Sequence, residues 1–385
     1  MSSVHQVGGN QLTLLKNGGE YFPQLCADID AAQRLVYMET YIFSADDVGA
    51  EVAGALRRAA SRGVTVRLLL DGYGSAGFPQ HWIDDMRAAG VEVQWFRRKI
   101  SPLTLRRSRL RRLHRKLVAV DGEIAFVGGI NIGSDIPNEH GFDAPRLDYA
   151  VRVRGELADE VRAAMQRLWE TVSRAAFRKR IKTEDWRLLP VKPNRNPEAQ
   201  LVLRDNVRHR RDIERAYIKA IAGAQREVIV ANAYFLPGRL FLRALMQAAR
   251  RGVRVVLLLQ GKVEYRLQHY ATLALYERLM AVGVEIYEYQ PSYLHAKVGV
   301  IDGEWATVGS FNIDPFSLLL AREANLVVRD ADFSAGLRAS LMHAIERDGR
   351  RISPAGYGIA MRFVARISYG LIRFAIGLSG ISRRH

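Results

Sequence analysis

Two copies of a His-x-Lys-x4-Asp motif, each followed by an asparagine, are the residues of this sequence best suited to chemistry. They comprise His114, Lys116, Asp121 and Asn131 in the first copy and His295, Lys297, Asp302 and Asn312 in the second. The asparagine follows its histidine by 17 positions in both copies, and Gly128-Gly129 or Gly309-Ser310 precedes it. Residues two apart on a strand share a face, so each histidine and its lysine point the same way. A matched pair of motifs predicts one site built from two halves, although a single His-x-Lys is often only a solvated surface pair.

These side chains suit the cleavage of a phosphodiester. A neutral histidine can attack phosphorus and form a phosphohistidine, which divides one difficult displacement into two easier ones. The second histidine would protonate the departing alkoxide and later take the proton of the incoming hydroxyl. Lysines would hold the negative phosphate oxygens, and the two asparagines would add amide donors. We expect no cofactor and no metal, because the lysines would compete with a divalent cation near Asp121 and Asp302.

The two motif aspartates have a structural alternative to a catalytic role. Each begins an Asp-Gly pair, Asp121-Gly122 and Asp302-Gly303. Asp-Gly pairs are typical of tight turns, because aspartate bonds to its neighbouring backbone and glycine adopts positive φ easily. We therefore keep both aspartates as candidate site residues and regard the shaping of a turn as their more ordinary function.

The motifs lie within a longer internal duplication. RGVTVRLLLDG, ending at Gly72, recurs as RGVRVVLLLQG, ending at Gly261, and HRKLVAVDGEIAFVGGIN recurs as HAKVGVIDGEWATVGSFN. Apolar β-branched runs predict buried strands at 35–40, 64–70 and 91–95, and again at 228–231, 253–259 and 284–289. Helical patterns between these runs predict βαβ units. We expect an α/β fold of two lobes with largely parallel sheets, which face each other about a pseudo-twofold axis.

The domain boundaries follow from this duplication. The first lobe would span residues 1–186 and the second lobe residues 201–348. A linker would join them at 187–200, a segment that contains three prolines. A basic amphipathic tail would follow at 349–385.

Length, charge and cysteine content restrict the class of protein. The 385 residues include 57 Lys and Arg against 40 Asp and Glu, which is a net charge of +17. Such a charge favours anionic partners, either nucleic acid or an anionic membrane. A single cysteine excludes an internal disulfide framework and a cysteine-based zinc site. The sequence contains neither a signal-peptide pattern nor an uninterrupted apolar run of membrane-spanning length.

The duplicated motif resembles that of the phospholipase D superfamily, in which H-x-K-x4-D precedes G-G or G-S and an asparagine. The resemblance covers the chain from its first predicted strand to about residue 345. It implies one active site between two lobes, a phosphohistidine intermediate and no metal. By analogy with that superfamily, we assign His114 as the nucleophile and His295 as the general acid and base. The symmetry of the motifs leaves the exchange of these two roles open.

The resemblance also implies a carboxylate that orients each histidine. Glu323 is the candidate in the second half, and Asp148 takes the corresponding place before a strand in the first half. Paired within each half, the carboxylate follows its histidine by 34 residues in the first copy and 28 in the second. A longer loop at 134–145 accounts for the difference.

Within the superfamily, the stretches 34–75 and 112–131 are similar to bacterial cardiolipin synthases of the shorter type. This similarity implies transfer of a phosphatidyl group from one phosphatidylglycerol to another, with release of glycerol. A phospholipase D-type hydrolase and a nuclease or phosphodiesterase acting on nucleic acid remain alternatives, because they would use the same residues. The basic segment 97–116 contains leucines but no aromatic stacking platform, which favours lipid over nucleic acid.

The C-terminal tail predicts a helix at a membrane surface. A helical arrangement separates an arginine side from an apolar side: Arg362, Arg366 and Arg373 against Val364, Ile367, Leu371, Phe374 and Leu378. This pattern suits an anionic interface, although a helix docked on the protein itself is the alternative. We expect a peripheral enzyme on the cytoplasmic face of the bacterial cell membrane, with anionic phospholipids such as phosphatidylglycerol as partners and no required oligomer.

Overall fold

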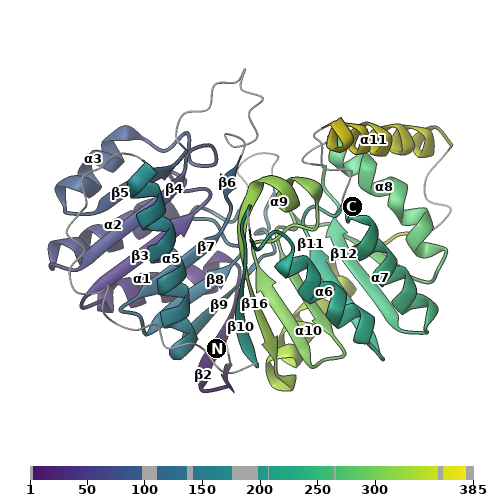
Figure 1. Cartoon of the computed structure of the whole chain (residues 1–385), viewed down its shortest axis with the longest axis horizontal. Helices are drawn as coiled ribbons and strands as arrows, with labels where there is room; N and C mark the ends of the chain where they lie inside the picture. The colour runs from purple at the N-terminus through teal and green to yellow at the C-terminus, as the bar shows by residue number, and fades with distance from the viewer. Residues whose placement is uncertain are drawn as a thin grey trace.

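The computed structural model describes residues 3–97, 111–136, 142–175, 198–206, 208–263, 266–353 and 359–378. Within these ranges the chain forms two β-sheets with helices packed against them (Figure 1). Seven strands of the first sheet and seven of the second follow one another in the same spatial order, β2-β9-β8-β7-β3-β4-β5 and β10-β16-β15-β14-β11-β12-β13. This is the α/β architecture of two duplicated lobes that the repeats predict.

The first sheet has eight strands. They are β1 (Val4–Val7), β2 (Asn10–Lys16), β3 (Leu35–Thr40), β4 (Thr65–Asp71), β5 (Glu92–Phe96), β7 (Lys116–Val120), β8 (Ile124–Gly128) and β9 (Tyr149–Arg154). Neighbours β3, β4 and β5 are parallel, and β3 and β4 are buried along nearly their whole length, as is typical of parallel strands. The other neighbouring pairs of this sheet are antiparallel.

The second sheet repeats this arrangement. Its strands are β10 (Ala199–Arg204), β11 (Glu227–Asn232), β12 (Arg254–Gln260), β13 (Glu285–Tyr289), β14 (Lys297–Ile301), β15 (Trp305–Gly309), β16 (Ala321–Arg329) and β17 (Gly349–Arg351). Its parallel part is β11, β12 and β13. The expectation of largely parallel sheets therefore holds only for the three strands predicted in each half. The remaining pairs include the hairpins β7–β8 and β14–β15, and a short hairpin turn can join only antiparallel strands.

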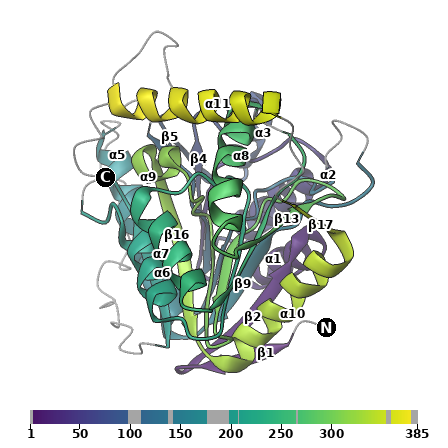
Figure 2. The ribbon, with the colours of Figure 1, turned by 90° about the vertical axis from the view of Figure 1, so that its right-hand side faces the viewer.

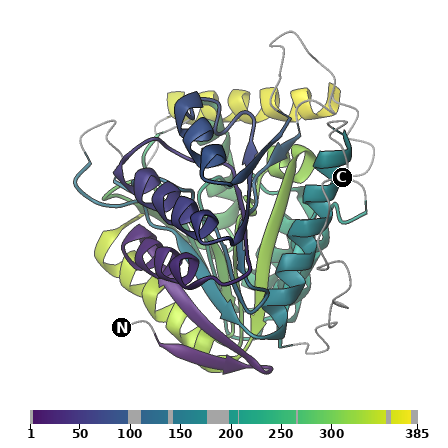
Figure 3. The ribbon, with the colours of Figure 1, turned by 90° about the vertical axis from the view of Figure 1, so that its left-hand side faces the viewer.

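Helices cover the outer face of each sheet, except that α5 and α10 bury their apolar residues in the central layer between the sheets. The helices are α1 (Asn17–Ala31), α2 (Asp47–Ser61), α3 (Gln80–Ala88), α5 (Glu156–Ala175), α6 (Asp212–Gly223), α7 (Arg239–Arg250), α8 (Arg266–Met280), α9 (Pro315–Leu320), α10 (Ala331–Asp348) and α11 (Ile359–Leu378). Helices α1, α2 and α3 lie on the outer side of the first sheet (Figure 3) and bury one apolar cluster there. Helices α6, α7 and α8 bury another on the second sheet. Two carboxylates cap helix starts, since Asp46 accepts the Gly49 N–H and Asp330 the Phe333 N–H, both at 2.8 Å.

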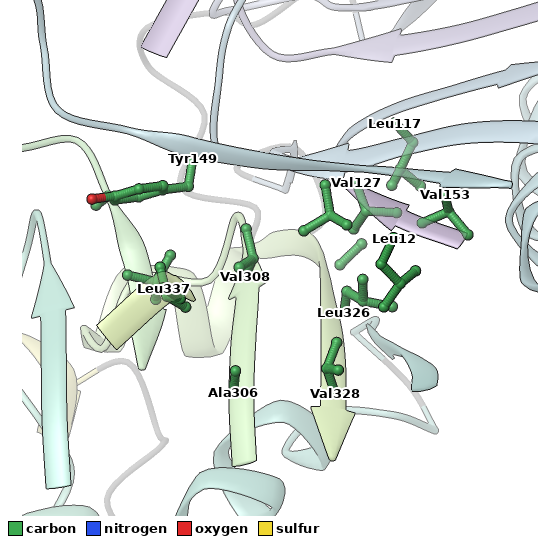
Figure 4. Packing of buried hydrophobic residues seen from close by; sticks show 14 of the residues in the cluster. Leu12, Leu117, Val127, Tyr149, Val153, Ala306, Val308, Leu326, Val328 and Leu337 are labelled. Carbon is green, nitrogen blue, oxygen red and sulfur yellow. The ribbon is translucent and has the colours of Figure 1, made fainter. Parts of the chain in front are cut away.

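The inner faces of the two sheets pack against each other and join the halves into one body. Figure 4 shows side chains of both sheets meeting in this layer. The labelled residues from the first sheet are Leu12, Leu117, Val127, Tyr149 and Val153, and those from the second half are Ala306, Val308, Leu326, Val328 and Leu337. Each of them has at most 1% of its surface exposed. Burial of this apolar layer is what holds the two motifs in a fixed relation to each other.

Several segments depart from the predicted boundaries. The two-residue strand β6 (Arg112–Leu113) belongs to the first half by sequence but pairs with β16 of the second sheet. Strand β10 begins at Ala199, inside the predicted linker, whose residues 187–197 lie outside the described part of the chain. Strand β17 extends the second sheet beyond the predicted end at residue 348. In Figure 2 helix α11 lies across the end of α8, and no helix among the described residues is both long and apolar enough to span a bilayer.

Candidate active site

Two short parallel bridges between the halves bring each motif histidine beside the other half. Leu113 of β6 lies opposite Arg322, and the His114 N–H donates to the Arg322 carbonyl oxygen at 3.0 Å. The second bridge joins Leu294 to Leu147, and the His295 N–H donates to the Leu147 carbonyl oxygen at 2.9 Å. The residues that follow Arg322 and Leu147 are the two predicted carboxylates, so each histidine meets the carboxylate of the opposite half.

The two histidine–carboxylate pairs are therefore crossed between the halves. His114 Nδ1 lies 3.0 Å from Glu323 Oε2, and His295 Nδ1 lies 2.6 Å from Asp148 Oδ2. Pairing within each half, which the sequence separations assumed, is wrong, because the bridges carry each histidine across the interface. Both carboxylates are buried, whereas 14% of the His114 side chain and 20% of the His295 side chain are exposed. The carboxylates sit behind the rings, and the rings alone reach the surface.

The motif lysines are the first residues of β7 and β14, two positions after their histidines, and are almost fully buried. Lys116 Nζ donates to the His114 carbonyl oxygen at 2.8 Å, and Lys297 Nζ donates to the His295 carbonyl oxygen. Burial, and after it the nearby charge of Lys297, lower the pKa of Lys116 to about 7. Two cations held close together in a buried site favour the binding of an anion between them.

Burial also lowers the pKa of both imidazoles. For His295, burial and then the charge of Lys297 lower the pKa to about 3, although Asp148 opposes this shift. For His114, burial outweighs the raising effect of Glu323. Both rings are then neutral near pH 7 in the empty site. A carboxylate that accepts a proton from Nδ1 leaves Nε2 as the unprotonated nitrogen of the ring.

The aromatic ring of Tyr41 completes the first half of the site. Its centroid lies 4.8 Å from that of the His114 ring, and Lys116 Nζ lies 5.3 Å from it. Tyr41 directly follows β3, and the repeated segment of the second half has its tyrosine, Tyr234, one position later, two residues after β11. The sequence identified this tyrosine only as a mark of the repeat, because nothing in its spacing relates it to His114.

A second pair of residues that the sequence analysis missed holds the backbone just before each histidine. The Leu113 N–H donates to Asp71 Oδ2 at 2.7 Å, and the Leu294 N–H donates to Gln260 Oε1 at 2.8 Å. Asp71 and Gln260 end the equivalent strands β4 and β12. The signal was present in the repeat, whose two copies end in LLLDG and LLLQG. An acceptor at the same place in both halves positions each motif histidine from behind.

The two motif aspartates lie away from the site, at the opposite ends of β7 and β14 from the histidines. Asp121 accepts the N–H groups of the three residues 33–35, each at 2.8 Å. Asp302 accepts those of residues 225–227 at 2.7 to 2.9 Å. Both have positive φ, 53° and 55°, as the first residues of their turns. Both aspartates therefore shape turns, which is the structural role that their Asp-Gly pairs indicated. Neither lies among the candidate catalytic groups.

The small residues before the asparagines pack directly under the carboxylates. A side chain at Gly129 would place its Cβ 2.3 Å from Asp148 Oδ1, so only glycine fits there. Ser310, at the matching position, donates from its hydroxyl to Glu323 Oε2 at 2.6 Å, and its carbonyl oxygen lies 3.2 Å from His114 Nδ1. The G-G motif thus goes with Asp148, which approaches the backbone of Gly129 closely, and the G-S motif goes with Glu323, which accepts the serine hydroxyl.

The asparagines occupy different surroundings in the two halves. Asn131 lines a pocket that also contains His295 and Asp148, and its Oδ1 accepts the Ile42 N–H at 3.3 Å. Asn312 is buried, and its Oδ1 has no hydrogen-bond partner among the described residues. The structure thus brings Asn131 to the histidine of the opposite half and leaves a buried acceptor on Asn312.

The assembled site contains two neutral imidazoles, each hydrogen-bonded to a buried carboxylate, and two buried lysines. Such an arrangement offers a nucleophilic nitrogen, a second nitrogen able to carry a proton, and fixed positive charge for an anionic substrate. No group of three or more His, Cys, Asp or Glu side chains with metal-binding geometry occurs within the described ranges.

Comparison with known proteins gives consistent results. The family described as "Cardiolipin synthase, PLD-like domain" matches residues 25–169 and 217–344. Cardiolipin synthase B of Shigella flexneri is 41% identical over 349 residues, which is 89% of this chain and 82% of that protein. A probable cardiolipin synthase of Bacillus subtilis, YwiE, is 30% identical over 92% of this chain and 70% of its own. Among solved structures, phosphatidylserine synthase of Haemophilus influenzae superposes with a TM-score of 0.67 at 13% identity, covering 96% of this chain and 95% of the other.

Proposed function

This chain belongs to the cardiolipin synthase family of phospholipase D-like proteins, and we propose that it joins two phosphatidylglycerol molecules into cardiolipin and glycerol. Its similarity to proteins named cardiolipin synthase makes it a phosphatidyltransferase. The observation that carries the proposed mechanism is the crossed arrangement of His114 with Glu323 and His295 with Asp148 in one site. One histidine alone would supply either a nucleophile or a proton donor, whereas a transfer reaction needs both.

The first step of the proposed reaction loads the enzyme. Nε2 of His114 attacks the phosphorus of the donor phosphatidylglycerol, and the P–N bond forms as the bond from phosphorus to the glycerol oxygen breaks. The departing glycerol oxygen takes a proton from the imidazolium form of His295. Binding of the anionic phosphodiester favours that protonated form, because it places negative charge beside a ring whose pKa burial has lowered.

The second step unloads the enzyme onto the acceptor. The terminal hydroxyl of a second phosphatidylglycerol attacks phosphorus, its proton passes to neutral His295, and the P–N bond breaks to give cardiolipin. Lys116 and Lys297 hold the non-bridging oxygens in both steps, and Asn131 and Asn312 supply amide donors. Glu323 and Asp148 orient the two rings through Nδ1, which keeps each Nε2 available for phosphorus or for the proton.

The proposed substrates lie in a membrane, and helix α11 offers a surface to meet them. Its described side chains divide into a buried side against α8, which includes Ala365 and Ile372, and an exposed apolar side. We call the exposed side the apolar face of α11; it consists of Phe363, Val364, Ile367, Leu371 and Phe374. Arg366 is exposed beside it, with its guanidinium 3.9 Å from Glu277. The side chains of Arg362, Arg373 and Leu378 lie outside the described set.

The position of α11 supports membrane docking of the whole enzyme. In Figure 1 it lies at the same edge of the molecule as α9 and β6, and β6 leads directly into His114. The helix docks on the protein through one side and leaves its apolar face exposed, and this exposed face supports the proposal of a membrane contact. We place this face in an anionic leaflet, at the cytoplasmic surface of the bacterial membrane.

Lipid analysis tests the proposed function. Purified protein is added to phosphatidylglycerol vesicles, and lipids and released glycerol are measured by mass spectrometry, with His114→Ala and His295→Ala in parallel. We expect cardiolipin and glycerol in equal amounts with the native protein and neither with the variants. Phosphatidic acid in place of cardiolipin would make the protein a hydrolase. If no lipid product forms, nucleic acid becomes the substrate to test, and the proposal fails.

A further inference from the structure

Cardiolipin synthesis requires two phosphatidyl groups, and the site described so far accounts for only one phosphate. A pocket adjoins the site on the His295 side. Its polar lining includes Ser44, Asn131, Asp135 and Arg146, next to His295 itself. We propose that Arg146 binds the phosphate of the acceptor lipid and so selects a phospholipid hydroxyl over water or a free alcohol. This inference rests on the proposed function and adds to it the acceptor site.

Among the described residues, the Arg146 side chain contacts an aromatic ring and no carboxylate. Within the part of the chain that the structure describes, no carboxylate forms an ion pair with it. Its guanidinium carbon lies 5.9 Å from the centroid of the Tyr293 ring, in a cation–π contact. The backbone of Arg146 is fixed, because its N–H donates to the Asp135 carbonyl oxygen at 2.7 Å. A partly buried guanidinium on a fixed backbone is suited to a phosphate.

The two carboxylates in the same pocket are already committed to other partners. Asp135 Oδ2 accepts the Gly18 N–H at 2.7 Å. Asp148 Oδ2 accepts from His295 Nδ1, and Asp148 Oδ1 accepts the Tyr149 N–H at 2.9 Å. These contacts reduce the negative charge that either carboxylate presents to the pocket. The hydroxyl and amide groups of the lining match the hydroxyls of a glycerol headgroup.

The backbone bridge next to Arg146 and His295 brings these two residues to neighbouring positions, so that Arg146 can hold the phosphate of the acceptor lipid while its hydroxyl faces His295. Leu147, the residue after Arg146, bridges to Leu294, the residue before His295. In phosphatidylglycerol the attacking hydroxyl and the phosphate lie at opposite ends of one glycerol. A lipid held at Arg146 by its phosphate can therefore extend its free hydroxyl towards His295, which accepts the proton in the second step.

The arginine also breaks the twofold symmetry of the site. The residue two positions before each orienting carboxylate is Arg146 in the first half and Ala321 in the second. The residue two positions before each histidine is Arg112 in the first half and Tyr293 in the second. At these two positions each bridge carries one arginine, on opposite strands, and the first bridge carries Arg322 in addition. Arg146 and His295 line the same pocket although they come from different halves of the chain. This asymmetry distinguishes an acceptor side of the site, at His295, from a donor side.

The test measures how the loaded enzyme divides its phosphatidyl group between two acceptors. Native protein, Arg146→Ala and Arg146→Lys are given phosphatidylglycerol vesicles in buffer that contains ethanol. Cardiolipin and phosphatidylethanol are then quantified together. Both products come from the same intermediate, so their ratio reports on the acceptor alone. Arg154→Ala, which removes an exposed arginine from the far end of β9, controls for the loss of one positive charge.

We expect the ratio of cardiolipin to phosphatidylethanol to fall about tenfold or more in Arg146→Ala, and less in Arg146→Lys, which keeps the charge. Arg154→Ala should keep the native ratio. An unchanged ratio in Arg146→Ala would overturn the inference. So would a parallel loss of both products in the two Arg146 variants with native melting curves, because Arg146 would then serve the donor. If the native protein forms neither product, it is the proposed function that fails.

Discussion

His114 and Glu323 are 209 positions apart in the sequence, yet His114 Nδ1 and Glu323 Oε2 lie 3.0 Å from each other. His295 and Asp148, the reciprocal pair, are 147 positions apart in the sequence, and His295 Nδ1 lies 2.6 Å from Asp148 Oδ2. Each half of the duplicated chain thus supplies a histidine whose orienting carboxylate belongs to the other half. Neither half alone contains an oriented imidazole, so the active site depends on the packing of the two sheets.

We expect removal of either orienting carboxylate to lower turnover strongly. Glu323→Gln and Asp148→Asn keep the size of the side chain but lose the charge that holds Nδ1–H and stabilises the imidazolium. Turnover should fall roughly 10²- to 10⁴-fold, with a smaller change in KM, measured as cardiolipin formed per enzyme. Asp84→Asn, on the exposed side of α3, serves as the control and should behave as native. Native turnover in both carboxylate variants would remove the orienting role.

The residue that carries the phosphatidyl group can be identified directly. Rapid mixing with phosphatidylglycerol, a quench in alkaline denaturant and peptide mass spectrometry should find the adduct on the peptide that contains His114. Alkaline conditions are needed because a phosphorus–nitrogen bond of this kind is labile in acid. An adduct on His295, whose pKa is also lowered by burial, would exchange the two roles.

Lys116→Met should be more stable than the native protein and much less active. Burial lowers the pKa of Lys116 to about 7 in the folded state, against 10.5 for an unperturbed lysine. Between these values the unfolded chain binds a proton that the folded protein does not, so the stability of the native protein rises with pH across this window. The advantage of the variant in thermal melting should therefore be largest at or below about pH 7 and shrink towards pH 10. Turnover should fall about 10²- to 10³-fold.

Asp302→Ala should affect stability rather than chemistry. The substitution removes the acceptor for three backbone N–H groups at the start of β11, and we expect the free energy of unfolding to fall by about 1–3 kcal/mol. Denaturant titration measures this change. Turnover of the folded fraction below the melting range should match the native value. Asp302→Asn keeps one acceptor oxygen and should lose less stability. A loss of turnover at native stability would return this aspartate to the catalytic set.

The apolar face of α11 should be required for binding to vesicles. Phe363→Asp and Phe374→Asp each place a charge on a side chain that is about two-thirds exposed, 66% and 65%, so the fold should tolerate them. Co-sedimentation with phosphatidylglycerol vesicles should fall roughly tenfold or more in the double variant. Val4→Asp, an equally exposed apolar position on β1, is the matched control and should sediment as native. Unchanged sedimentation of the double variant would place the membrane contact elsewhere.

Much of this protein can be predicted from local sequence patterns. The two copies of the motif and the repeated LLLDG and LLLQG strands indicated a duplicated α/β fold, the three parallel strands of each half and the histidine–lysine pairs. These features depend on residues a few positions apart, whose relation is set by the two-residue period of a strand or by the hydrogen bonds of a turn. For the same reason the Asp-Gly pairs already indicated what Asp121 and Asp302 do in the structure.

The tertiary structure alone decided which half completes which site. No period in the sequence relates His114 to Glu323, Leu294 to Gln260, or Arg146 to the pocket of His295, because these contacts arise where two sheets pack and two short bridges cross between them. The sheets meet through a layer of interchangeable aliphatic side chains, which specify burial but not the partner across the interface. Local pattern therefore determined the candidate catalytic groups, and the packing of the halves determined how those groups are paired.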